Sequence, residues 1–374
     1  MEEERLLAAR EAIAEADREM ARLFEKRMQA AAEIAAYERE RGLPILDAAQ
    51  EKRVIERDLG YIETDALRGL YVQFIRGVMD VSKKYQRRLM EGMRVAYSGV
   101  EGAFAHIAAR RIFPEGVLIP CADFPSAYAA VEAGECDVCV LPVENSYAGE
   151  VGQVLDLMFT GSLHVTGMYA LPVTHHLLGA PGATLADVRR VVSHPQALAQ
   201  CAAYIRRRGL ESLPAANTAR AARQVGEAKD PALAAIASRE TAELYGLTIL
   251  DEDINDSGLN STRFAVFSRA ENRELPAQAS GFLLQFTVNH IAGALAQALQ
   301  VIGGHGFNMR TLRSRPMKDL PWHYYFYAEV EGDDRGEAGR RMLDELRACC
   351  NQLKVAGRYA ADILLEDTKE EMRP

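Results

Sequence analysis

The pattern of apolar and polar positions divides the chain into three parts. Residues 1–92 show helical periodicity and no convincing strand, whereas residues 93–270 alternate short apolar strands with helices. Residues 280–362 repeat that alternation after the polar linker RAENRELPAQAS. We therefore expect an all-helical domain over 1–92, an α/β domain over 93–270 and a smaller α/β domain over 271–374.

In the first part, an apolar stripe predicts one helix from about residue 5 to about residue 41. The stripe residues fall within about 80° of Ile13 on a wheel of about 100° per residue. They are Leu6, Ile13, Met20, Leu23, Phe24, Ala31 and Ile34. Such a helix is roughly 55 Å long, more than a small domain covers, so its stripe should pack on a partner chain. The sequence thus predicts a homodimer or a higher homo-oligomer, with a Gly-Leu-Pro break and a second helix completing a helical hairpin.

Three charged residues lie inside this stripe. Arg10, Arg27 and Glu38 fall at about +60°, −40° and −20° on the same wheel. An internal ion pair, or a long side chain that reaches the edge of the stripe, would satisfy one such charge. Two arginines on one face favour an anionic ligand inside a helical bundle.

Composition and charge limit the classes of function that the sequence is compatible with. A net charge of −9 with scattered basic residues gives no electrostatic footprint for nucleic acid, so an anionic ligand must be held by a local cluster. No apolar run approaches the roughly 20 residues that span a bilayer, and the acidic N-terminus is unlike a secretion signal. We expect a cytoplasmic protein that binds neither nucleic acid nor membrane.

The six cysteines include one pair with metal or redox spacing, Cys136 and Cys139. The pair falls in an apolar stretch that reads as a buried strand, where residues three apart point to opposite faces. A second pair that could complete a four-ligand zinc site is missing from the sequence. We expect buried core thiols and no metal site.

The middle part contains several strand-to-helix junctions that could accept anions. Gly99 and Gly102, after the strand that ends at Ser98, let backbone N–H groups approach a ligand at a helix N-terminus. Further junctions follow Ser193, Asn217 and Ser238, with Gln196 and Thr218 in the first turns of the helices. An ordinary strand–helix turn explains any one of them. Together they suggest a ligand with more than one negative group.

Two further stretches place polar side chains where strands meet loops. VLPVENSYAGEV (140–151) ends a buried strand, and DINDSGLNSTRFAVFSR (253–269) runs a polar loop into a strand. Ligands bind at the carboxyl ends of strands in α/β sheets. For each residue taken alone, a capped loop with Arg263 on a structural carboxylate is an equal alternative. The polar residues are Glu144, Asn145, Ser146, Asn260, Thr262 and Arg263.

The motifs GVEGAF, PVENSYAG, SHPQALAQC and NSTRF occur in the order and approximate spacing of prephenate dehydratase, and this resemblance covers essentially all of 93–270. It implies two α/β lobes with the active site in the cleft, similar to bilobal ligand-binding proteins. It also implies conversion of prephenate, a substrate with two carboxylates, to phenylpyruvate, CO2 and water without metal or organic cofactor.

The resemblance also suggests roles for individual residues. Thr262 is expected to aid the leaving hydroxyl by donating or relaying a hydrogen bond, and Glu144 is either a proton relay or structural. Arg263 is either a carboxylate clamp or a support for the loop. The expected catalytic set is Thr262, Glu144, Asn145 and Ser146, and the expected substrate-binding set is Ser98, Gly102, Ser193, Gln196, Thr218, Asn260 and Arg263.

Residues 5–90 resemble the all-helical chorismate mutase domain. The matching positions are Arg10, Arg27, Asp47, Glu51, Ser82 and Gln86. Two positions depart from the family, because Glu38 stands where it carries a substrate-gripping lysine and Gln50 where it carries an arginine. These changes make the site three charge units more negative, so we expect an impaired mutase that mainly dimerises the chain. The alternative is a fully bifunctional enzyme that also takes chorismate.

In the third part, the pattern predicts strands and helices in the order βαββαβ. This part resembles an ACT regulatory domain of the phenylalanine-sensing kind. The effector-binding stretches are Gly293, Ala294 and Leu295, and Ser314, Arg315 and Pro316. The family usually has glutamate before that Ser-Arg-Pro, whereas this chain has Arg313, so we expect phenylalanine binding of altered strength. A non-catalytic amino-acid sensor and a dehydratase that prefers arogenate remain alternatives.

Overall fold

The computed structural model describes residues 2–41, 48–272, 281–318 and 320–365. These residues belong to two compact units, Met1–Met93 and Arg94–Pro374. The break at 42–44, Asp47 and most of the linker 269–280 lie outside the described residues.

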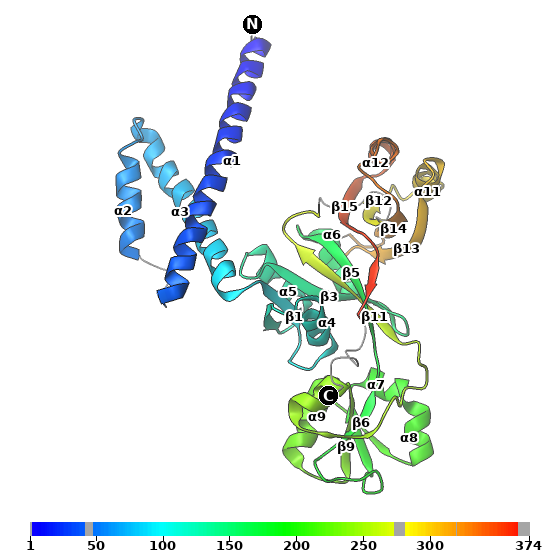
Figure 1. Cartoon of the computed structure of the whole chain (residues 1–374). Helices are drawn as coiled ribbons and strands as arrows, with labels where there is room; N and C mark the ends of the chain where they lie inside the picture. Colours follow the sequence, from blue (N-terminus) through cyan, green and yellow to red (C-terminus); the bar gives the residue numbers. More distant parts are fainter. Residues whose placement is uncertain (1, 42–47, 273–280, 319, 366–374) are drawn as a thin grey trace. The chain divides into compact units, whose positions relative to one another are not determined.

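The first unit is helical over its described residues, as the sequence predicts. Its helices are α1 (Glu2–Arg41), α2 (Ala48–Leu59) and α3 (Asp65–Glu91). Helix α1 packs on α3, and α3 on α2, and the N-terminal half of α1 runs beyond the other two (Figure 1). Among its described residues the buried apolar side chains are few: Ala31, Ala35, Ile75 and Met79.

The predicted apolar stripe is largely uncovered in a single chain. Ala31 is buried, but the other six stripe residues are 43–63% exposed. Helix α3 adds Leu70 (61% exposed) and Phe74 (53%) to this uncovered apolar surface. A partner chain that covers it stays a prediction.

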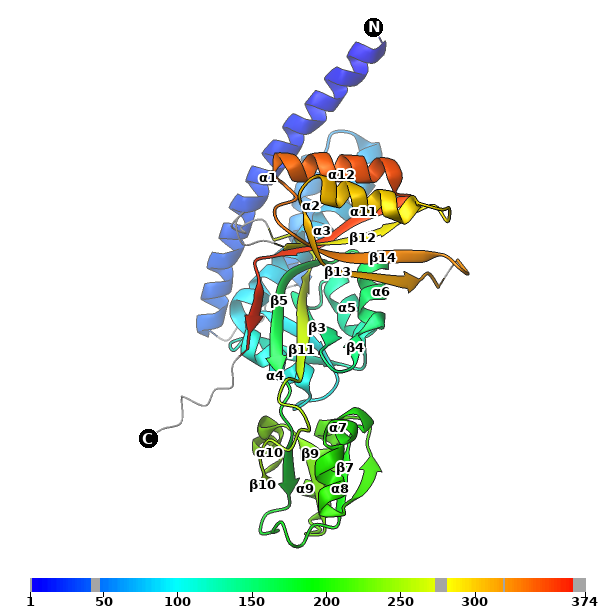
Figure 2. The same cartoon turned by 90° about the vertical axis from the view of Figure 1, so that its right-hand side faces the viewer.

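The second unit contains two α/β lobes joined by two chain connections (Figure 2). In the first lobe the strand order is β5-β11-β3-β1-β2, with β4 paired to β3. The strands are β1 (Arg94–Ser98), β2 (Val117–Cys121), β3 (Val138–Asn145), β4 (Gly149–Glu150), β5 (His164–Pro172) and β11 (Ser261–Ser268). The helices are α4 (Phe104–Ile112), α5 (Phe124–Glu132) and α6 (Gly152–Thr160). Cys136 and Cys139 are free thiols buried in this lobe's core, as expected.

The second lobe has its own sheet, in the order β10-β6-β9-β7-β8. The strands are β6 (His176–Gly179), β7 (Arg190–Ser193), β8 (Glu211–Pro214), β9 (Leu233–Ala237) and β10 (Thr248–Asp251). The helices are α7 (Pro195–Gln200), α8 (Ala202–Arg208), α9 (Thr218–Ala228) and α10 (Arg239–Tyr245). The chain enters this lobe after β5 and returns to the first lobe at β11. The returning loop therefore leads directly into the sheet of the first lobe.

The C-terminal part has the predicted order βαββαβ. It comprises β12 (Gly281–Thr287), α11 (Ala294–Gly304), β13 (Asn308–Pro316), β14 (Tyr324–Glu331), α12 (Glu337–Cys349) and β15 (Gln352–Tyr359). The strands pair in the order β13-β14-β12-β15, with α11 and α12 side by side on one face (Figure 2). Strand β15 meets β5 of the first lobe at Gly357↔Val165, and β16 (Asp362–Leu364) also pairs with β5. The sheet of the first lobe therefore continues into this part.

Candidate active site

Asn145, the last residue of β3, is the centre of a polar cluster between the lobes. Its Oδ1 accepts the backbone N–H groups of Tyr147 (3.0 Å) and Ala148 (2.9 Å), which fixes the orientation of the amide. Its Nδ2 therefore points toward β11 and donates to Thr262 Oγ1 (2.9 Å) and Asn260 Oδ1 (3.0 Å). Because the Thr262 oxygen accepts this bond, its own hydrogen is available for a ligand.

Asn260 supplies a second unused donor beside Thr262. Only 7% of the residue is exposed, and its buried Nδ2 has no hydrogen-bond partner among the described residues. A buried donor left unpaired costs about 1–3 kcal/mol, so this arrangement is favourable when a ligand accepts from it.

The second lobe reaches the same cluster through Gln196, at the start of α7. Its Nε2 donates to Asn145 Oδ1 across the lobes (3.4 Å). Thr218, the first residue of α9, is 8% exposed, and half-buried Ser98 ends β1, so both lie at the junctions where the sequence predicts them. The structure thus brings together Asn145, Gln196, Asn260 and Thr262 from both lobes.

Gly102 lies at a close contact between the lobes. Its φ is +85°, and a Cβ at this position would lie 3.1 Å from Leu244 Cδ2 and 3.4 Å from Ala219 Cβ, so a side chain would separate the two lobes. Its carbonyl accepts from Thr241 Oγ1 (3.1 Å). The structure places Gly102 where the lobes meet, and its backbone N–H donates to His106 Nδ1 (3.2 Å).

Glu144 and Arg263 lie on the opposite face of the sheet from Thr262. The antiparallel register pairs Thr262 with Asn145 and Arg263 with Glu144, and successive residues of a strand face opposite sides. Arg263 Nη1 contacts Glu144 Oε2 (3.2 Å) and Glu329 Oε1 (2.8 Å). The geometry thus agrees with a structural role for Glu144 and a supporting role for Arg263. For each residue, this is the second of the two roles that the sequence left open.

The charges of this network stabilise one another. Burial opposes the charge of Arg263, yet Glu329 and Asp362 raise the pKa of its guanidinium above the ordinary value. Burial alone would raise the pKa of Glu329, but Arg263 and the Tyr327 and Tyr359 hydroxyls bring it below its ordinary value. The strand that carries Thr262 is therefore anchored by ion pairs to β14 and β16.

Ser146 and Ser193 use their hydroxyls within the protein. Ser146 Oγ donates to Leu259 O (3.0 Å) and accepts from Ser261 N (2.9 Å), which holds the loop before Thr262. Ser193 is fully buried and donates to Ile236 O (2.5 Å). Both hydroxyls therefore hold backbone groups of the protein.

In the helical unit, some mutase-like residues meet and others do not. Arg27 donates to Ser82, which lies one turn before Gln86 on the buried face of α3. Arg10 is exposed and lies about 25 Å from Arg27 along the helix, so one chain cannot bring both to one small ligand. Half-buried Glu38 keeps Oε2 buried without a hydrogen-bond partner among the described residues.

The mutase-like residues of α2 make contacts within the hairpin. Glu51 pairs with Lys83 (3.0 Å), which also pairs with Asp80 (2.8 Å). Gln50 Oε1 accepts from Arg53 Nη2 (2.7 Å). These contacts orient both side chains without any ligand.

The expected effector stretches lie at the start of α11 and on β13. Gly293 has φ +83° and precedes Ala294 and Leu295, and Ser314 and Pro316 are exposed. Arg315 and Arg313 point instead to the first lobe. Arg315 pairs with Asp156 (2.9 Å) and Glu150 (3.1 Å), and Arg313 with Glu144 (2.9 Å).

Sequence reasoning missed the carboxylates that anchor these arginines. Glu329 is 2% exposed within the apolar strand YYFYAEVE, and a charge at such a position is a signal that a buried cation pairs with it. Its partner, Arg263, is 66 residues away in the sequence, so the local pattern could not identify it.

Two family models match the chain. The model described as prephenate dehydratase matches residues 95–272, and that described as chorismate mutase type II matches residues 9–87. A curated bifunctional chorismate mutase/prephenate dehydratase of Aquifex aeolicus is 31% identical over 374 residues, covering 97% of this chain and 100% of the relative. The chain belongs to this family.

Two solved structures cover 72% of this chain, each with a TM-score of 0.67. One, GqqA, is described as a novel type of quorum quenching acylase; it is 36% identical and 98% covered. The other is a prephenate dehydratase from Arthrobacter aurescens in complex with L-Phe, 28% identical and 90% covered.

Within the part of this chain that the structure describes, no helix is long and apolar enough to cross a membrane.

Proposed function

We propose that the cleft converts prephenate to phenylpyruvate with Thr262 aiding departure of the ring hydroxyl. The observation that carries this role is the hydrogen bond from Asn145 Nδ2 to Thr262 Oγ1 (2.9 Å), which leaves the threonine hydrogen free to donate. Asn145 thus acts as the residue that orients Thr262. An alcohol is too weak an acid to transfer its proton outright, so Thr262 donates a hydrogen bond or relays a proton from water.

The chemistry balances without a cofactor. The ring hydroxyl takes up one proton and leaves as water, while the bond between the opposite ring carbon and its carboxylate breaks and CO2 leaves. The electron pair of that bond enters the ring, which becomes aromatic. The Asn260 Nδ2 donor, Gln196 and the N-terminus of α9 at Thr218 are the groups that we assign to the substrate's negative oxygens.

The test is to incubate the full-length protein separately with prephenate, arogenate and an N-acylated amine. Phenylpyruvate formed from prephenate supports the proposal, and the rate with arogenate decides between the two dehydratase substrates. Turnover of the acyl compound alone would favour the activity described for GqqA. A protein that binds these compounds without converting any of them is a sensor, which would refute the proposal.

We propose also that the βαββαβ part is an ACT domain through which phenylalanine inhibits the enzyme. The prephenate dehydratase structure with bound L-Phe supports this assignment. Inhibition requires that phenylalanine bind one conformation better than another. Gly293→Val places a β-branched residue at φ +83° and should weaken inhibition about tenfold, whereas Gly303→Val, where an added Cβ meets nothing within 4 Å, should not. Equal inhibition of both variants would place the effector elsewhere.

We propose that the helical unit is mainly a dimerising scaffold with impaired mutase activity. The uncovered apolar stripe and the distance between Arg10 and Arg27 both fit a binding site that a second copy of the chain completes. Glu38 brings a carboxylate where a dianionic chorismate would bind, and two like charges about 4 Å apart repel by roughly 4 kcal/mol at an effective dielectric of 20. The alternative, a fully bifunctional enzyme, requires that Glu38 be neutral or turned away.

The free cysteines fit our further proposal of a cytoplasmic location.

A further inference from the structure

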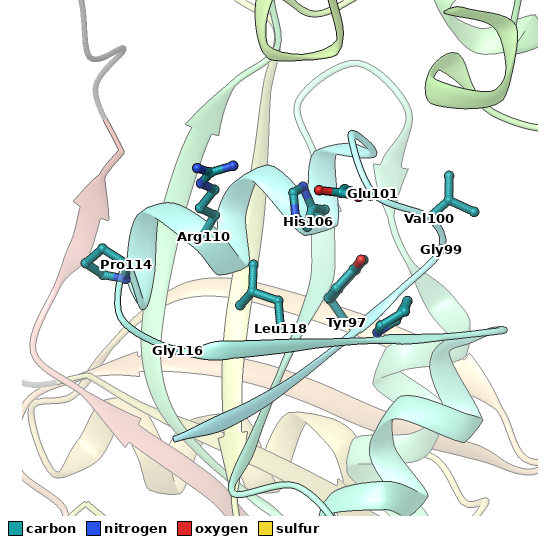
Figure 3. Close-up of a pocket in the computed structure, with 10 residues that line it drawn as sticks. Tyr97, Gly99, Val100, Glu101, His106, Arg110, Pro114, Gly116 and Leu118 are labelled. Atoms are coloured by element: carbon teal, nitrogen blue, oxygen red, sulfur yellow. The ribbon is translucent and has the colours of Figure 1, made fainter. Parts of the chain in front are cut away.

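A cavity of about 570 Å³ lies on the first lobe, beside the edge strand β2. Its walls are the face of α4 that carries His106 and Arg110, the strands β1 and β2, and the loop from Gly99 to Glu101 (Figure 3). The cluster around Thr262 and Asn145 does not contribute to its lining. Cavities of this size bind small molecules in other proteins.

Two nearly buried polar side chains line the middle of this cavity. Tyr97 is 2% exposed, and its hydroxyl makes no hydrogen bond with any of the described residues. Figure 3 shows this hydroxyl pointing toward His106 and Glu101. The side chain is buried but its hydroxyl opens into the cavity, so a ligand there meets a free hydrogen-bonding group.

His106, which is 8% exposed, supplies a second donor. Its Nδ1 accepts the backbone N–H of Gly102 (3.2 Å), and burial lowers the pKa of the ring, so the neutral imidazole carries its hydrogen on Nε2. Tyr97 and His106 lie with ring centroids 5.2 Å apart. Both residues line the cavity, so a ligand there meets two hydrogen-bond donors, a pair that suits a carboxylate.

Opposite charges lie on either side of His106 in the lining of the cavity (Figure 3). Arg110 follows His106 by one turn of α4, and Glu101 precedes that helix (Figure 3). Both side chains are exposed and form no ion pair with the described residues. Leu118 and Pro120 of β2 add an apolar surface on the same face as Tyr97.

We propose that this cavity is a second small-molecule site, which binds an aromatic α-amino acid. The carboxylate is held by the Tyr97 hydroxyl, the His106 Nε2–H and the Arg110 guanidinium, the ammonium by Glu101, and the side chain rests on Leu118 and Pro120.

The site is connected to the cleft through one loop. Glu101 O accepts from Tyr245 Oη of the second lobe (3.2 Å), and the next residue, Gly102, packs against that lobe. An amino acid bound at Glu101 would therefore change the lobe contacts and shift the KM for prephenate. This consequence rests on the proposed function, whereas the binding itself does not.

Equilibrium dialysis of the full-length protein with labelled L-phenylalanine, and separately with L-tyrosine, tests the site. At least one of them should bind the wild type at a site that Arg110→Gln and Glu101→Gln each weaken about tenfold or more. Arg206→Gln, which changes an exposed arginine of α8, should leave this binding unchanged. Phenylalanine bound at the ACT domain would persist in all three variants and would appear as a separate site.

Ligand analogues sharpen the assignment. 3-Phenylpropionate lacks the ammonium and phenethylamine lacks the carboxylate, so each should compete at least about tenfold less well than the amino acid. Tyr97→Phe removes only the hydroxyl and should also weaken binding. The proposal is overturned if neither amino acid binds, or if Arg110→Gln and Glu101→Gln leave all binding unchanged.

Discussion

The cleft and the helical unit differ in whether one chain completes the site. In the cleft, Asn145 contacts both Thr262 on the neighbouring strand and Gln196 from the other lobe. In the helical unit, Arg27 contacts Ser82, but Arg10 lies about 25 Å away along the same helix. The family-matching residues around Asn145 therefore contact one another within one chain, whereas Arg10 and Arg27 of the helical unit are too far apart to do so.

The two regions also differ in the kind of buried polar atom that they leave unpaired among the described residues. The cleft leaves a donor, Asn260 Nδ2, and the helical unit leaves an acceptor, Glu38 Oε2. A dianionic substrate needs donors around it. The unpaired donor of Asn260 fits such a substrate, whereas the unpaired carboxylate oxygen of Glu38 does not.

The largest expected effect is the loss of dehydratase activity in Thr262→Ala. A group that assists proton transfer contributes about 10²–10⁴ in rate, so kcat for phenylpyruvate formation should fall by that factor. Thr262→Ser keeps the hydroxyl and should lose much less. Turnover by a folded Thr262→Ala protein within a few-fold of wild type would remove Thr262 from the chemistry.

The next effect is on stability. Arg263→Gln leaves Glu329 buried without its cation, and breaking a buried pair in this way costs about 3–5 kcal/mol of unfolding free energy. Urea denaturation measures this difference, and Arg206→Gln, at an exposed position of α8, is a matched control. A loss below about 1 kcal/mol would show that the network contributes little.

The same pair predicts a pH dependence. The folded-state pKa of Glu329 is below its ordinary value of 4.5, so the stabilisation is present above pH 4.5 and is lost as pH falls through the lower folded-state pKa. Without the cation, burial raises the pKa of Glu329, so the stability gap between wild type and Arg263→Gln should begin to shrink above pH 4.5 and continue to shrink below it. A gap that stays constant down to acid unfolding would contradict this cause.

A smaller effect is expected in the helical unit, where activity should be gained. Glu38→Lys with Gln50→Arg replaces a carboxylate by cations, so chorismate turnover should rise at least about tenfold. Glu38→Gln, which removes the charge without adding a cation, should give an intermediate rate. Loss of chorismate turnover in the double variant would refute the electrostatic explanation.

The last prediction concerns assembly. Ile13→Glu with Leu23→Glu puts charges on the uncovered stripe and should dissociate the oligomer, as measured by analytical ultracentrifugation. Lys26→Glu, on the polar face of α1, should not. Dehydratase turnover should stay within a few-fold, because the cleft is formed within one chain. An unchanged mass would mean that the stripe is not the interface.

Local patterns predicted much of this fold, because helical periodicity and apolar strands depend on near neighbours in the sequence. Strand alternation alone separates Glu144 from Asn145, since adjacent residues of β3 face opposite sides of the sheet. What the sequence could not supply was the register that pairs Arg263 with Glu144, or the choice of Glu329 and Asp362 as its further partners. Those contacts join strands that are far apart in the sequence.

The most direct test of the account is a side-by-side assay of the wild-type protein on chorismate and prephenate. We expect phenylpyruvate from prephenate at a rate that depends on Thr262, and little conversion of chorismate. Conversion of chorismate as fast as that of prephenate, in a protein that still carries Glu38 and Gln50, would show that the helical unit is a second working site and would contradict the account.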